Sequence, residues 1–572
     1  MPEARFEAMR RSDLLWLAAA LLLLVATGIG VRDPWPADEP RFAALARDMA
    51  MTGEWLFPRV GGDLYADKPP LYFWMLSAAY EVIGSVRWSF LIPSLLSAAG
   101  VLLLVYDMGR RLAGRQAGLC AALTLACTVQ FLTTMRSAQI DATLCLVMTL
   151  SLYSLLRHLF WGPAWGWYFL GGFAAGLGVI TKGVGFLPML VLLLYWPMRK
   201  FRWQGLASIP QGGLRWAIAP LALLLGIFVW FVPMLLAVAG KGEPGYAAYR
   251  DEILFHQTVT RYAAAWHHHQ PWHYFLVQVI PALWLPWSLL LFWLVPRWRD
   301  AWRARDARVW LPLGWLLLLL LFFSLSPGKR SIYMHPALPA LAIAATPFLV
   351  ALFQRRGVQR AGIALACVPI LGAVVFAAAH LVGAPFARKA IEGANLQGPW
   401  PIYLFLVLAL AGLGMALWRK PVAAWLATTC ALAVTFSWAV APAMNPERSG
   451  AAFMQGVQAR LRPGELLGLV AYKEQFLLYL QVPTVNFGHR RWLEGPQEGY
   501  DAAAWLAGSS GRVLLVPESS LKPCFEHSAE RQPVGESAGD DWYLIRGGGD
   551  AACASRGNAD RAISYDPRAA GT

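Results

Sequence analysis

The chain has 572 residues, of which 57% are apolar, only 15% are charged and 28 are tryptophan. Soluble proteins carry roughly 25% charged residues, so the composition excludes a soluble multidomain protein. Tryptophan collects where a membrane meets water, which indicates a polytopic membrane protein. The net charge of +15 does not indicate nucleic acid as a partner, because the basic residues alternate with long apolar runs and form no single stripe.

Thirteen apolar stretches approach or reach the length of about 20 residues that crosses a bilayer. In chain order they cover residues 14–31, 88–108, 116–134, 139–156, 166–181, 184–198, 216–238, 273–296, 309–325, 332–351, 361–382, 400–418 and 421–442. The fifth and sixth are short and are interrupted by glycines between Gly176 and Gly185. We therefore expect a mainly α polytopic membrane protein with about 13 transmembrane helices.

Arginine-rich segments predict the orientation of these helices. With the N-terminus in the cytoplasm, the basic loops all share the cytoplasmic side, at residues 110–115, 199–215, 297–308, 355–360 and 419–420, as the positive-inside rule requires. No convincing cleavage site follows the first apolar stretch, so we expect it to stay as an anchor. The opposite, periplasmic side then carries a first loop at 32–87, a second near 239–272, and everything after Asn445.

The segment after Asn445 differs from the rest. It alternates short apolar runs, such as Leu466 to Tyr472 and Val513 to Val516, with polar, helix-compatible stretches, which is typical of a small α/β domain. We expect a transmembrane domain over 1–445 and a periplasmic α/β domain over 446–572, with a disordered end in the last 25 residues.

Two of the seven cysteines, Cys524 and Cys553, lie outside the predicted spans. Cysteines in one small domain that faces an oxidising compartment tend to pair. The sequence therefore predicts a disulfide between them.

Ionisable residues that the positive-inside rule does not explain gather at the periplasmic ends of the spans. Asp38 precedes a predicted helix in the first loop, and Asp141 lies at the start of the fourth span. Each could simply cap a helix. A carboxylate at the edge of a membrane is, however, costly to bury unpaired, so both are candidate catalytic residues.

Cations lie on the same predicted face, which is what binding a phosphate-bearing lipid requires. They are Arg41, Lys68, Lys182, Arg261 and Lys329. Lys182 could instead extend along apolar surface toward the interface, and the loop with Lys329 could be an ordinary solvated turn. Two acidic residues among many cations suggest glycosyl transfer from a lipid phosphate.

The second loop contains His256 and three consecutive histidines, 267–269. Consecutive histidines lack the i, i+4 spacing of a metal-binding pair on a helix. Asp67 and His256 form an alternative pair for a divalent metal such as zinc, which only folding could bring together.

Taken in order, the motifs resemble the lipid A aminoarabinose transferases of the GT-C glycosyltransferase superfamily, to which protein O-mannosyltransferases also belong. The matching motifs are Asp33-Pro34 with Asp38-Glu39-Pro40-Arg41, Tyr65 to Leu71, Ser137 to Asp141, Thr181-Lys182-Gly183, Arg261-Tyr262 with Gln270-Pro271-Trp272, and Phe322 to Tyr333. Two positions depart from the family pattern: Asp67 stands where glutamate is usual, and Phe42 stands where a tyrosine often follows the arginine.

The resemblance implies a GT-C fold with juxtamembrane helices in the first loop, and an inner-membrane pentosyltransferase. A single in-line displacement with inversion is simpler than a covalent intermediate, so we expect an inverting enzyme. It would move 4-amino-4-deoxy-L-arabinose from undecaprenyl phosphate to lipid A, which confers polymyxin resistance, and we expect it to act as a monomer. Asp38, Asp141 and Lys68 would be catalytic. The expected substrate-binding residues are Arg41, Tyr65, Asp67, Lys182, Arg261, Lys329 and Tyr333.

Two other functions remain open from the sequence. Another GT-C enzyme would move a different polyprenyl-phosphate sugar to a protein or glycan. A lipid or sugar transporter usually has inverted repeats and charges at the bilayer midplane, whereas this chain has no visible repeat and gathers its unusual charges at one interface. The tail could serve any of these as a lid or docking module.

Overall fold

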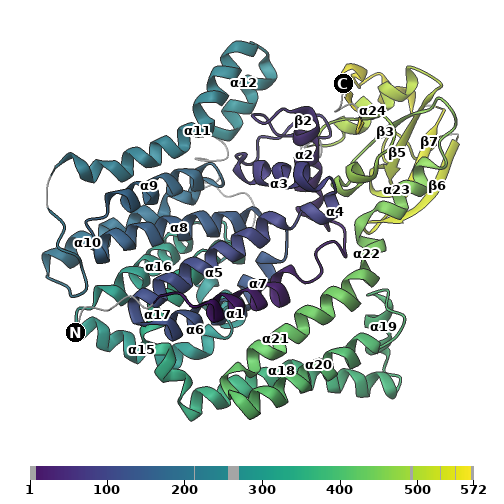
Figure 1. Ribbon diagram of the computed structural model, residues 1–572. Coiled ribbons are helices and arrows are strands. Elements are labelled where there is room, and N and C mark those ends of the chain that lie inside the picture. The colour runs from purple at the N-terminus through teal and green to yellow at the C-terminus, as the bar shows by residue number, and fades with distance from the viewer. Residues whose placement is uncertain are drawn as a thin grey trace. The chain divides into compact units, whose positions relative to one another are not determined.

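The computed structural model describes residues 8–210, 213–254, 269–489, 494–528, 530–547 and 549–568. The chain forms two compact units, each built from separate segments (Figure 1). The first, here called the helical unit, comprises Met1–Val31, Asp67–Tyr72 and Leu91–Ala441. The second, here called the mixed unit, comprises Arg32–Ala66, Phe73–Phe90 and Pro442–Thr572. Most of the first loop thus belongs to the same unit as the tail. The predicted division into residues 1–445 and 446–572 does not describe this grouping.

The regular secondary structure in the described part of the helical unit consists of helices. They are α1 (Arg11–Leu21), η1 (Leu22–Ala26), α5 (Ile92–Ala113), α6 (Arg115–Ala126), α7 (Val129–Met135), α8 (Ile140–Trp161), α9 (Trp165–Val179), η2 (Gly183–Leu190), α10 (Val191–Lys200), η3 (Leu214–Ala217), α11 (Ile218–Lys241), α12 (Pro244–Asp251), η5 (Phe275–Val279), α14 (Ile280–Leu283), α15 (Trp287–Arg303), α16 (Ala307–Leu325), η6 (Ser331–Met334), α17 (Ala337–Phe353), α18 (Arg356–Leu381), α19 (Pro385–Glu392), α20 (Trp400–Arg419), η7 (Pro421–Ala423), α21 (Ala424–Thr435) and η8 (Phe436–Val440).

Each of the thirteen predicted stretches contains helix, but the number of spans is not confirmed. In the part of the chain that the structure describes, eight helices are long and apolar enough to cross a membrane, or up to ten if two bent pairs each count as one. The bent pairs are α6 with α7, at 67°, and the η5–α14 segment with α15, at 110°. The first, fifth and sixth predicted spans correspond to helices that do not meet the same criterion of length and composition.

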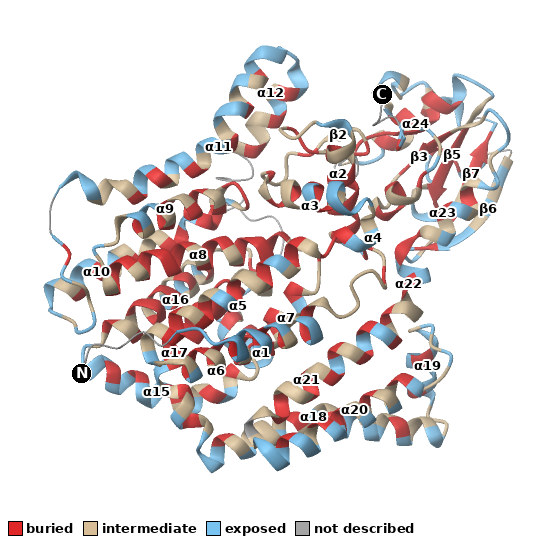
Figure 2. Cartoon of the chain, in the orientation of Figure 1, coloured by how far each residue is buried: buried red, intermediate tan, exposed pale blue. Residues whose placement is uncertain are grey.

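Burial separates inner from outer helices within the helical unit. In α8, 83% of the most apolar stretch is buried, and in the η6–α17 span the share is 72%, whereas it is 28% in the η3–α11 span and 17% in α18. Figure 2 shows the same contrast between α8 and α11. Apolar side chains exposed along whole helices are what contact with lipid requires, because only lipid makes such exposure favourable.

Close packing explains the glycines of the fifth predicted span. A Cβ atom on Gly172 of α9 would lie 2.0 Å from the carbonyl oxygen of Ala219, and one on Gly176 would lie 2.1 Å from that of Leu223. Helices in membranes approach closely where small residues face each other. The glycines therefore let α9 and α11 pack backbone to backbone.

The mixed unit combines the first-loop elements with the tail. Its elements are α2 (Glu39–Thr52), β1 (Arg59–Val60), β2 (Asp63–Leu64), α3 (Leu71–Ile83), α4 (Val86–Ser89), α22 (Ala441–Ser449), α23 (Ala451–Gln458), β3 (Leu466–Leu469), η9 (Glu474–Tyr479), β4 (Thr484–Asn486), α24 (Gln497–Ala507), β5 (Arg512–Pro517), η11 (Glu518–Ser520), β6 (Glu530–Ser537), β7 (Asp540–Arg546), α25 (Ala551–Ala554), η12 (Ala559–Arg561) and β8 (Ile563–Tyr565). The strands of the tail form one six-stranded sheet in the order β6-β7-β5-β3-β4-β8. Strand β3 is parallel to both β4 and β5, and the outer pairings are antiparallel.

Three sequence predictions about the tail can be compared with this sheet. The α/β character is confirmed, because the apolar runs form β3, β5 and β7. The disulfide between Cys524 and Cys553 is also confirmed, with a Cα–Cα distance of 5.6 Å. The expectation of a disordered end is wrong for residues 549–568, since β8 pairs with β4 through Thr484 and Tyr565. The polar composition of this segment gave no sign of the short strand β8, which forms by pairing with the sheet.

One ion pair inside the tail makes its stability depend on pH. Arg546, at the end of β7, donates two hydrogen bonds to Glu465, just before β3, at 2.6 and 2.9 Å, and both side chains are buried. This hydrogen bonding lowers the pKa of the Glu465 carboxyl. A carboxyl with a depressed folded-state pKa contributes stability that is fully present above its unfolded pKa, about 4.5, and is lost as pH falls through the folded value.

We expect Glu465→Gln to remove about 1.5–3 kcal/mol of this stability at neutral pH, the range for a hydrogen bond to a charged group. The measurement is amide exchange protection in β3, β5 and β7 of the full chain from pH 7 down to pH 3. In the wild type, protection should decrease as the pH drops below about 4.5. In the variant, protection at pH 7 should already be lower and should change less with pH. Identical pH profiles for both chains would contradict this role of Glu465.

Candidate active site

A partly buried ion pair lies at the beginning of α8. Nζ of Lys182 donates a hydrogen bond of 2.7 Å to Oδ1 of Asp141, whose residue is 6% exposed. The helix begins after Gln139, and Asp141 stands in its first turn. Because the Asp141 carboxylate is engaged by Lys182, neither the capping alternative for Asp141 nor the free extension of Lys182 describes these side chains.

Tyr333 completes this cluster. Nζ of Lys182 lies 5.0 Å from the centroid of the Tyr333 ring, within the range of a cation–π contact. The same ring packs against Phe323 with centroids 5.2 Å apart. Three residues predicted for the site, from α8, the turn after α9 and η6, are thus brought together.

The loop before η6 is hydrogen-bonded to a second predicted motif, Gln270-Pro271-Trp272. Nζ of Lys329 donates to the carbonyl oxygens of Gln270, at 2.9 Å, and Ser326, at 2.6 Å, and the residue is 4% exposed. The backbone of His269 also pairs with that of Gly328. Burial lowers the pKa of the Lys329 ammonium. The structure therefore places Lys329 inside its loop and not at the surface of a solvated turn.

Lys68 begins the segment that leads into α3. Its Nζ donates to the carbonyl oxygen of Asp67 at 3.0 Å. The amide of Leu71 donates to the carbonyl oxygen of Ile180 at 3.3 Å. This backbone bond ties the Lys68 segment to the turn that carries Lys182.

Two predicted site residues, His256 and Arg261, lie outside the described residues. Among the described ones, the structure contains no group of three or more histidine, cysteine, aspartate or glutamate side chains that could hold a metal ion. The only described member of the predicted zinc pair is Asp67, which is partly exposed.

In the mixed unit, Arg41 is held by a residue of the tail. Its Nε donates to Oε1 of Glu474 at 2.7 Å, and its Nη1 lies 3.8 Å from Oδ1 of Asp38. Asp38 occupies the N-cap position of α2, but its side chain accepts no capping hydrogen bond from the described residues. Burial opposes the charge of Arg41, yet Tyr65 and Glu474 raise the pKa of its guanidinium overall.

A second residue of the tail, His489, lies beside the same motif. Its Nδ1 is 3.7 Å from Oε1 of Glu474, and its ring packs edge-on against Tyr65 with centroids 5.4 Å apart. Tyr65 is 2% exposed. Sequence reasoning did not find Glu474 or His489, because each lies more than 400 residues from its partner and in no recognisable motif.

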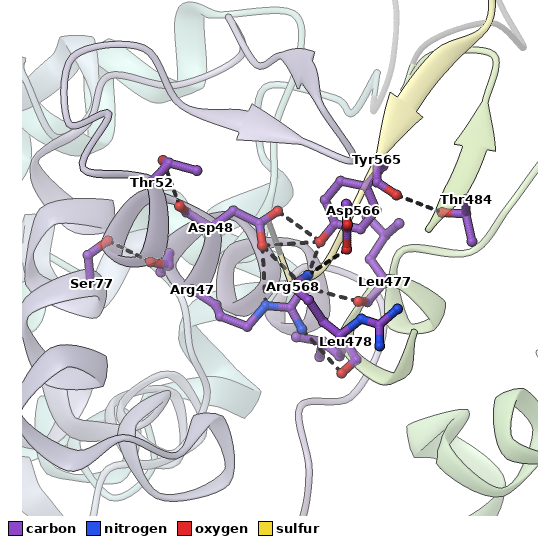
Figure 3. Close-up of polar contacts among 11 residues, drawn as sticks. Arg47, Asp48, Thr52, Ser77, Leu477, Leu478, Thr484, Tyr565, Asp566 and Arg568 are labelled. Carbon is purple, nitrogen blue, oxygen red and sulfur yellow. Dashed lines mark hydrogen bonds and ion pairs between the residues drawn. The ribbon is translucent and has the colours of Figure 1, made fainter. Parts of the chain in front are cut away.

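The tail also fixes the far end of α2 (Figure 3). Nη2 of Arg47 donates to the carbonyl oxygen of Leu477 at 3.1 Å and to the hydroxyl of Tyr565 at 2.6 Å, and that hydroxyl donates to Asp48 at 3.0 Å. Burial raises the pKa of the Asp48 carboxyl. The helix that carries Arg41 is therefore anchored to the tail at two places.

Glu39, the second residue of the Asp-Glu-Pro-Arg motif, has a structural role. Its carboxylate accepts hydrogen bonds from Arg32, at 2.5 and 2.8 Å, and from the amide of Trp35, at 2.9 Å. The residue is 5% exposed. Satisfied hydrogen bonds on both carboxylate oxygens shape the turn before α2.

The fold and this site define an integral-membrane glycosyltransferase of the GT-C class. A family model for dolichyl-phosphate-mannose-protein mannosyltransferases matches residues 67–236. The crystal structure of ArnT from Cupriavidus metallidurans bound to undecaprenyl phosphate superposes with a TM-score of 0.72 at 22% identity, over 94% of this chain and 98% of that one. At this identity the superposition establishes the fold.

Sequence relatives identify the family more narrowly. The undecaprenyl phosphate-alpha-4-amino-4-deoxy-L-arabinose arabinosyl transferase of Pseudomonas aeruginosa is 32% identical over 449 residues, which cover 74% of this chain and 75% of the relative. The enzyme of the same name from Edwardsiella ictaluri is 30% identical over 346 residues, 57% of each chain. The chain belongs to this family of arabinosyl transferases.

Proposed function

We propose that the chain transfers 4-amino-4-deoxy-L-arabinose from undecaprenyl phosphate to a phosphate group of lipid A, as a monomer at the periplasmic face of the inner membrane. The added amine would mask negative charge on lipid A and give resistance to polymyxin. The observation that carries the proposal is the partly buried cluster of Asp141, Lys182 and Tyr333, which joins a carboxylate to a cation at the edge of the apolar helices.

The proposed reaction is one displacement at the anomeric carbon of the sugar. An oxygen of the acceptor phosphate forms the new bond to that carbon as the bond to the oxygen of undecaprenyl phosphate breaks, and the electron pair leaves with undecaprenyl phosphate. A phosphate oxygen is already ionised near neutral pH, so no strong general base is needed. The harder task is to stabilise charge on the departing phosphate.

Residue roles follow from this division. Lys68 and Arg261, helped by Lys182 and Lys329, would stabilise the leaving phosphate, because positioned cations act strongly where water is excluded. Asp38 and Asp141 would orient the acceptor or balance positive charge on the sugar. Arg41, Tyr65, Asp67 and Tyr333 would contact substrate. The bond from Arg41 to Glu474 would hold the guanidinium in place, and Tyr333 would contact substrate beside Lys182.

A divalent metal such as zinc, held by Asp67 and His256, is a further part of the proposal. Carboxylate oxygen and imidazole nitrogen are ligands that zinc accepts, and a bound ion would add positive charge near the phosphates. We expect purified wild-type protein to carry metal that Asp67→Ala loses, as elemental analysis would measure. Equal metal content in both proteins would contradict a ligand role for Asp67.

The decisive experiment is mass spectrometry of lipid A from a strain that lacks aminoarabinose transfer, with and without this chain. We expect added pentosamine on lipid A phosphates only when the chain is present. Unmodified lipid A, with a sugar found instead on a protein or glycan, would support another GT-C transferase. Export of lipid or sugar without any transfer product would support a transporter.

A further inference from the structure

A polar pocket opens beside the ion-paired cluster of the helical unit. It has a volume of about 250 Å³, which is room for roughly eight waters at about 30 Å³ each. Most of its lining residues are polar: Gln130, Thr133, Thr134, Ser137, Gln139, Leu283, Arg330, Ser331 and Ile332. This lining includes one cation and no carboxylate among the described residues, so its charge favours an anion.

Several donors in the pocket are available to a ligand. The guanidinium of Arg330, the side-chain amide of Gln139 and the hydroxyl of Thr134 make no hydrogen bond or ion pair with the described residues, whereas the side chains of Gln130 and Lys329 do. Arg330 is exposed, and Thr134 is 6% exposed. A cation and two neutral donors around one pocket can therefore bind an anion without first breaking an internal hydrogen bond.

The wall of the pocket is fixed. Nε2 of Gln130 donates to the carbonyl oxygen of Ser331 at 2.6 Å, and its Oε1 accepts a hydrogen bond of 2.8 Å from Nε1 of Trp284. Gln130 is 3% exposed. These bonds join α7 to η6 and to the end of α14, so the donors are held in place before a ligand arrives.

The position of the pocket suits the headgroup of a lipid. Arg330 lies between Leu325, where one apolar helix ends, and Ser331, where the next candidate span begins. The lining residues Gln139 and Ser331 each precede by two positions a member of the cluster, Asp141 and Tyr333. A phosphate in the pocket would therefore lie at headgroup depth, next to the residues proposed for transfer.

We propose that this pocket binds the phosphate monoester of the acceptor lipid, separately from the phosphate of the donor. The inference rests on the proposed function, in which two phosphates must be held at once, one attacking and one leaving. A guanidinium fork binds phosphate oxygens in pairs, and neutral amide and hydroxyl donors complete the shell. The volume accommodates a headgroup phosphate and leaves the acyl chains in the membrane.

The test measures binding by the full chain in lipid nanodiscs, with lipid A that carries both phosphates, the same lipid without them, and undecaprenyl phosphate as probes. We expect Arg330→Gln to weaken binding of phosphorylated lipid A at least tenfold, and to change binding of the dephosphorylated lipid and of undecaprenyl phosphate less than twofold. The affinity of Arg330→Lys for phosphorylated lipid A should lie between those of wild type and Arg330→Gln, because the lysine ammonium is a point charge and lacks the two-pronged guanidinium. Inorganic phosphate at millimolar concentration should compete only weakly.

Arg388→Gln is the matched control, because Arg388 is an exposed arginine of α19 that does not line the pocket. Gln139→Leu provides a second variant that removes a neutral donor and should weaken lipid A binding severalfold. The proposal is overturned if Arg330→Gln binds phosphorylated lipid A as wild type does, if it loses undecaprenyl phosphate instead, or if inorganic phosphate displaces lipid A fully. Because the readout is binding, lipid A that binds through Arg330 but receives no pentosamine would reject the proposed function and leave the phosphate site standing.

Discussion

Asp141→Asn is expected to lower aminoarabinose transfer about a hundredfold or more at matched protein abundance. The substitution keeps size and hydrogen-bonding capacity but deletes the charge that Lys182 contacts at 2.7 Å. A charge-stabilising contact in a transition state is worth about 3 kcal/mol, which corresponds to roughly a hundredfold in rate. The measurement is the fraction of lipid A that carries pentosamine in cells expressing each variant.

Loss of a buried charge can also destabilise a protein, so the control variant must likewise remove a buried carboxylate charge. Asp13 is 5% exposed and accepts a hydrogen bond of 2.7 Å from Tyr106, yet it lies in none of the motifs. Asp13→Asn should therefore alter abundance or thermal stability without a specific loss of transfer. Full modification by Asp141→Asn, or an equal loss per folded molecule with Asp13→Asn, would remove the catalytic role from Asp141.

Asp141 and Lys182 could each be identified from the sequence as a candidate site residue. A carboxylate at the edge of a membrane is costly to bury unpaired, and Lys182 is one of the cations on the same predicted face. What the sequence could not give was the partner of each. A carboxylate at a helix start is equally suited to capping, and only tertiary packing decided against it.

The same limit explains the residues that sequence reasoning missed. Arg41 was identified from its motif, but its partner Glu474 follows it by 433 positions, and no local pattern encodes such a contact. The predicted number of spans is not confirmed, for a related reason. The rule of about 20 residues assumes straight and independent spans, whereas α7 and α14 belong to bent segments and α9 packs its glycines against α11.

The tail shows where local patterns succeed and where they fail. Continuous apolar runs mark strands that are buried on both faces, and β3 and β5 were found from such runs. Strand β8 has only three residues and lies in a polar stretch of the chain, and it pairs with the edge that β4 offers. An edge strand of this kind draws its stability from the sheet more than from its own sequence.

Lys68→Ala is expected to abolish lipid A modification, with a rate loss of at least about 10²–10³, the range for removal of one preorganised charge-stabilising group. Lys68 precedes two prolines, which restrict the backbone around it, and the bond from Leu71 to Ile180 fixes this segment beside the turn of Lys182. The ammonium is thus held in position before substrate binds. It can then stabilise the leaving phosphate without reorganisation at the moment of reaction.

A cation that only attracted the donor would behave differently from one that acts on the transition state. Loss of simple attraction raises KM and leaves kcat unchanged, whereas loss of leaving-group stabilisation lowers kcat and kcat/KM together. We expect the second pattern for Lys68→Ala with undecaprenyl phosphate aminoarabinose as the varied substrate, and partial recovery for Lys68→Arg. Lys389→Ala, which removes an exposed lysine of α19, should leave both constants unchanged. A rise in KM alone for Lys68→Ala would limit the role of Lys68 to binding the donor. Wild-type kinetics for this variant would exclude Lys68 from the site, because the variant has no other change that could restore a positioned charge next to the departing phosphate.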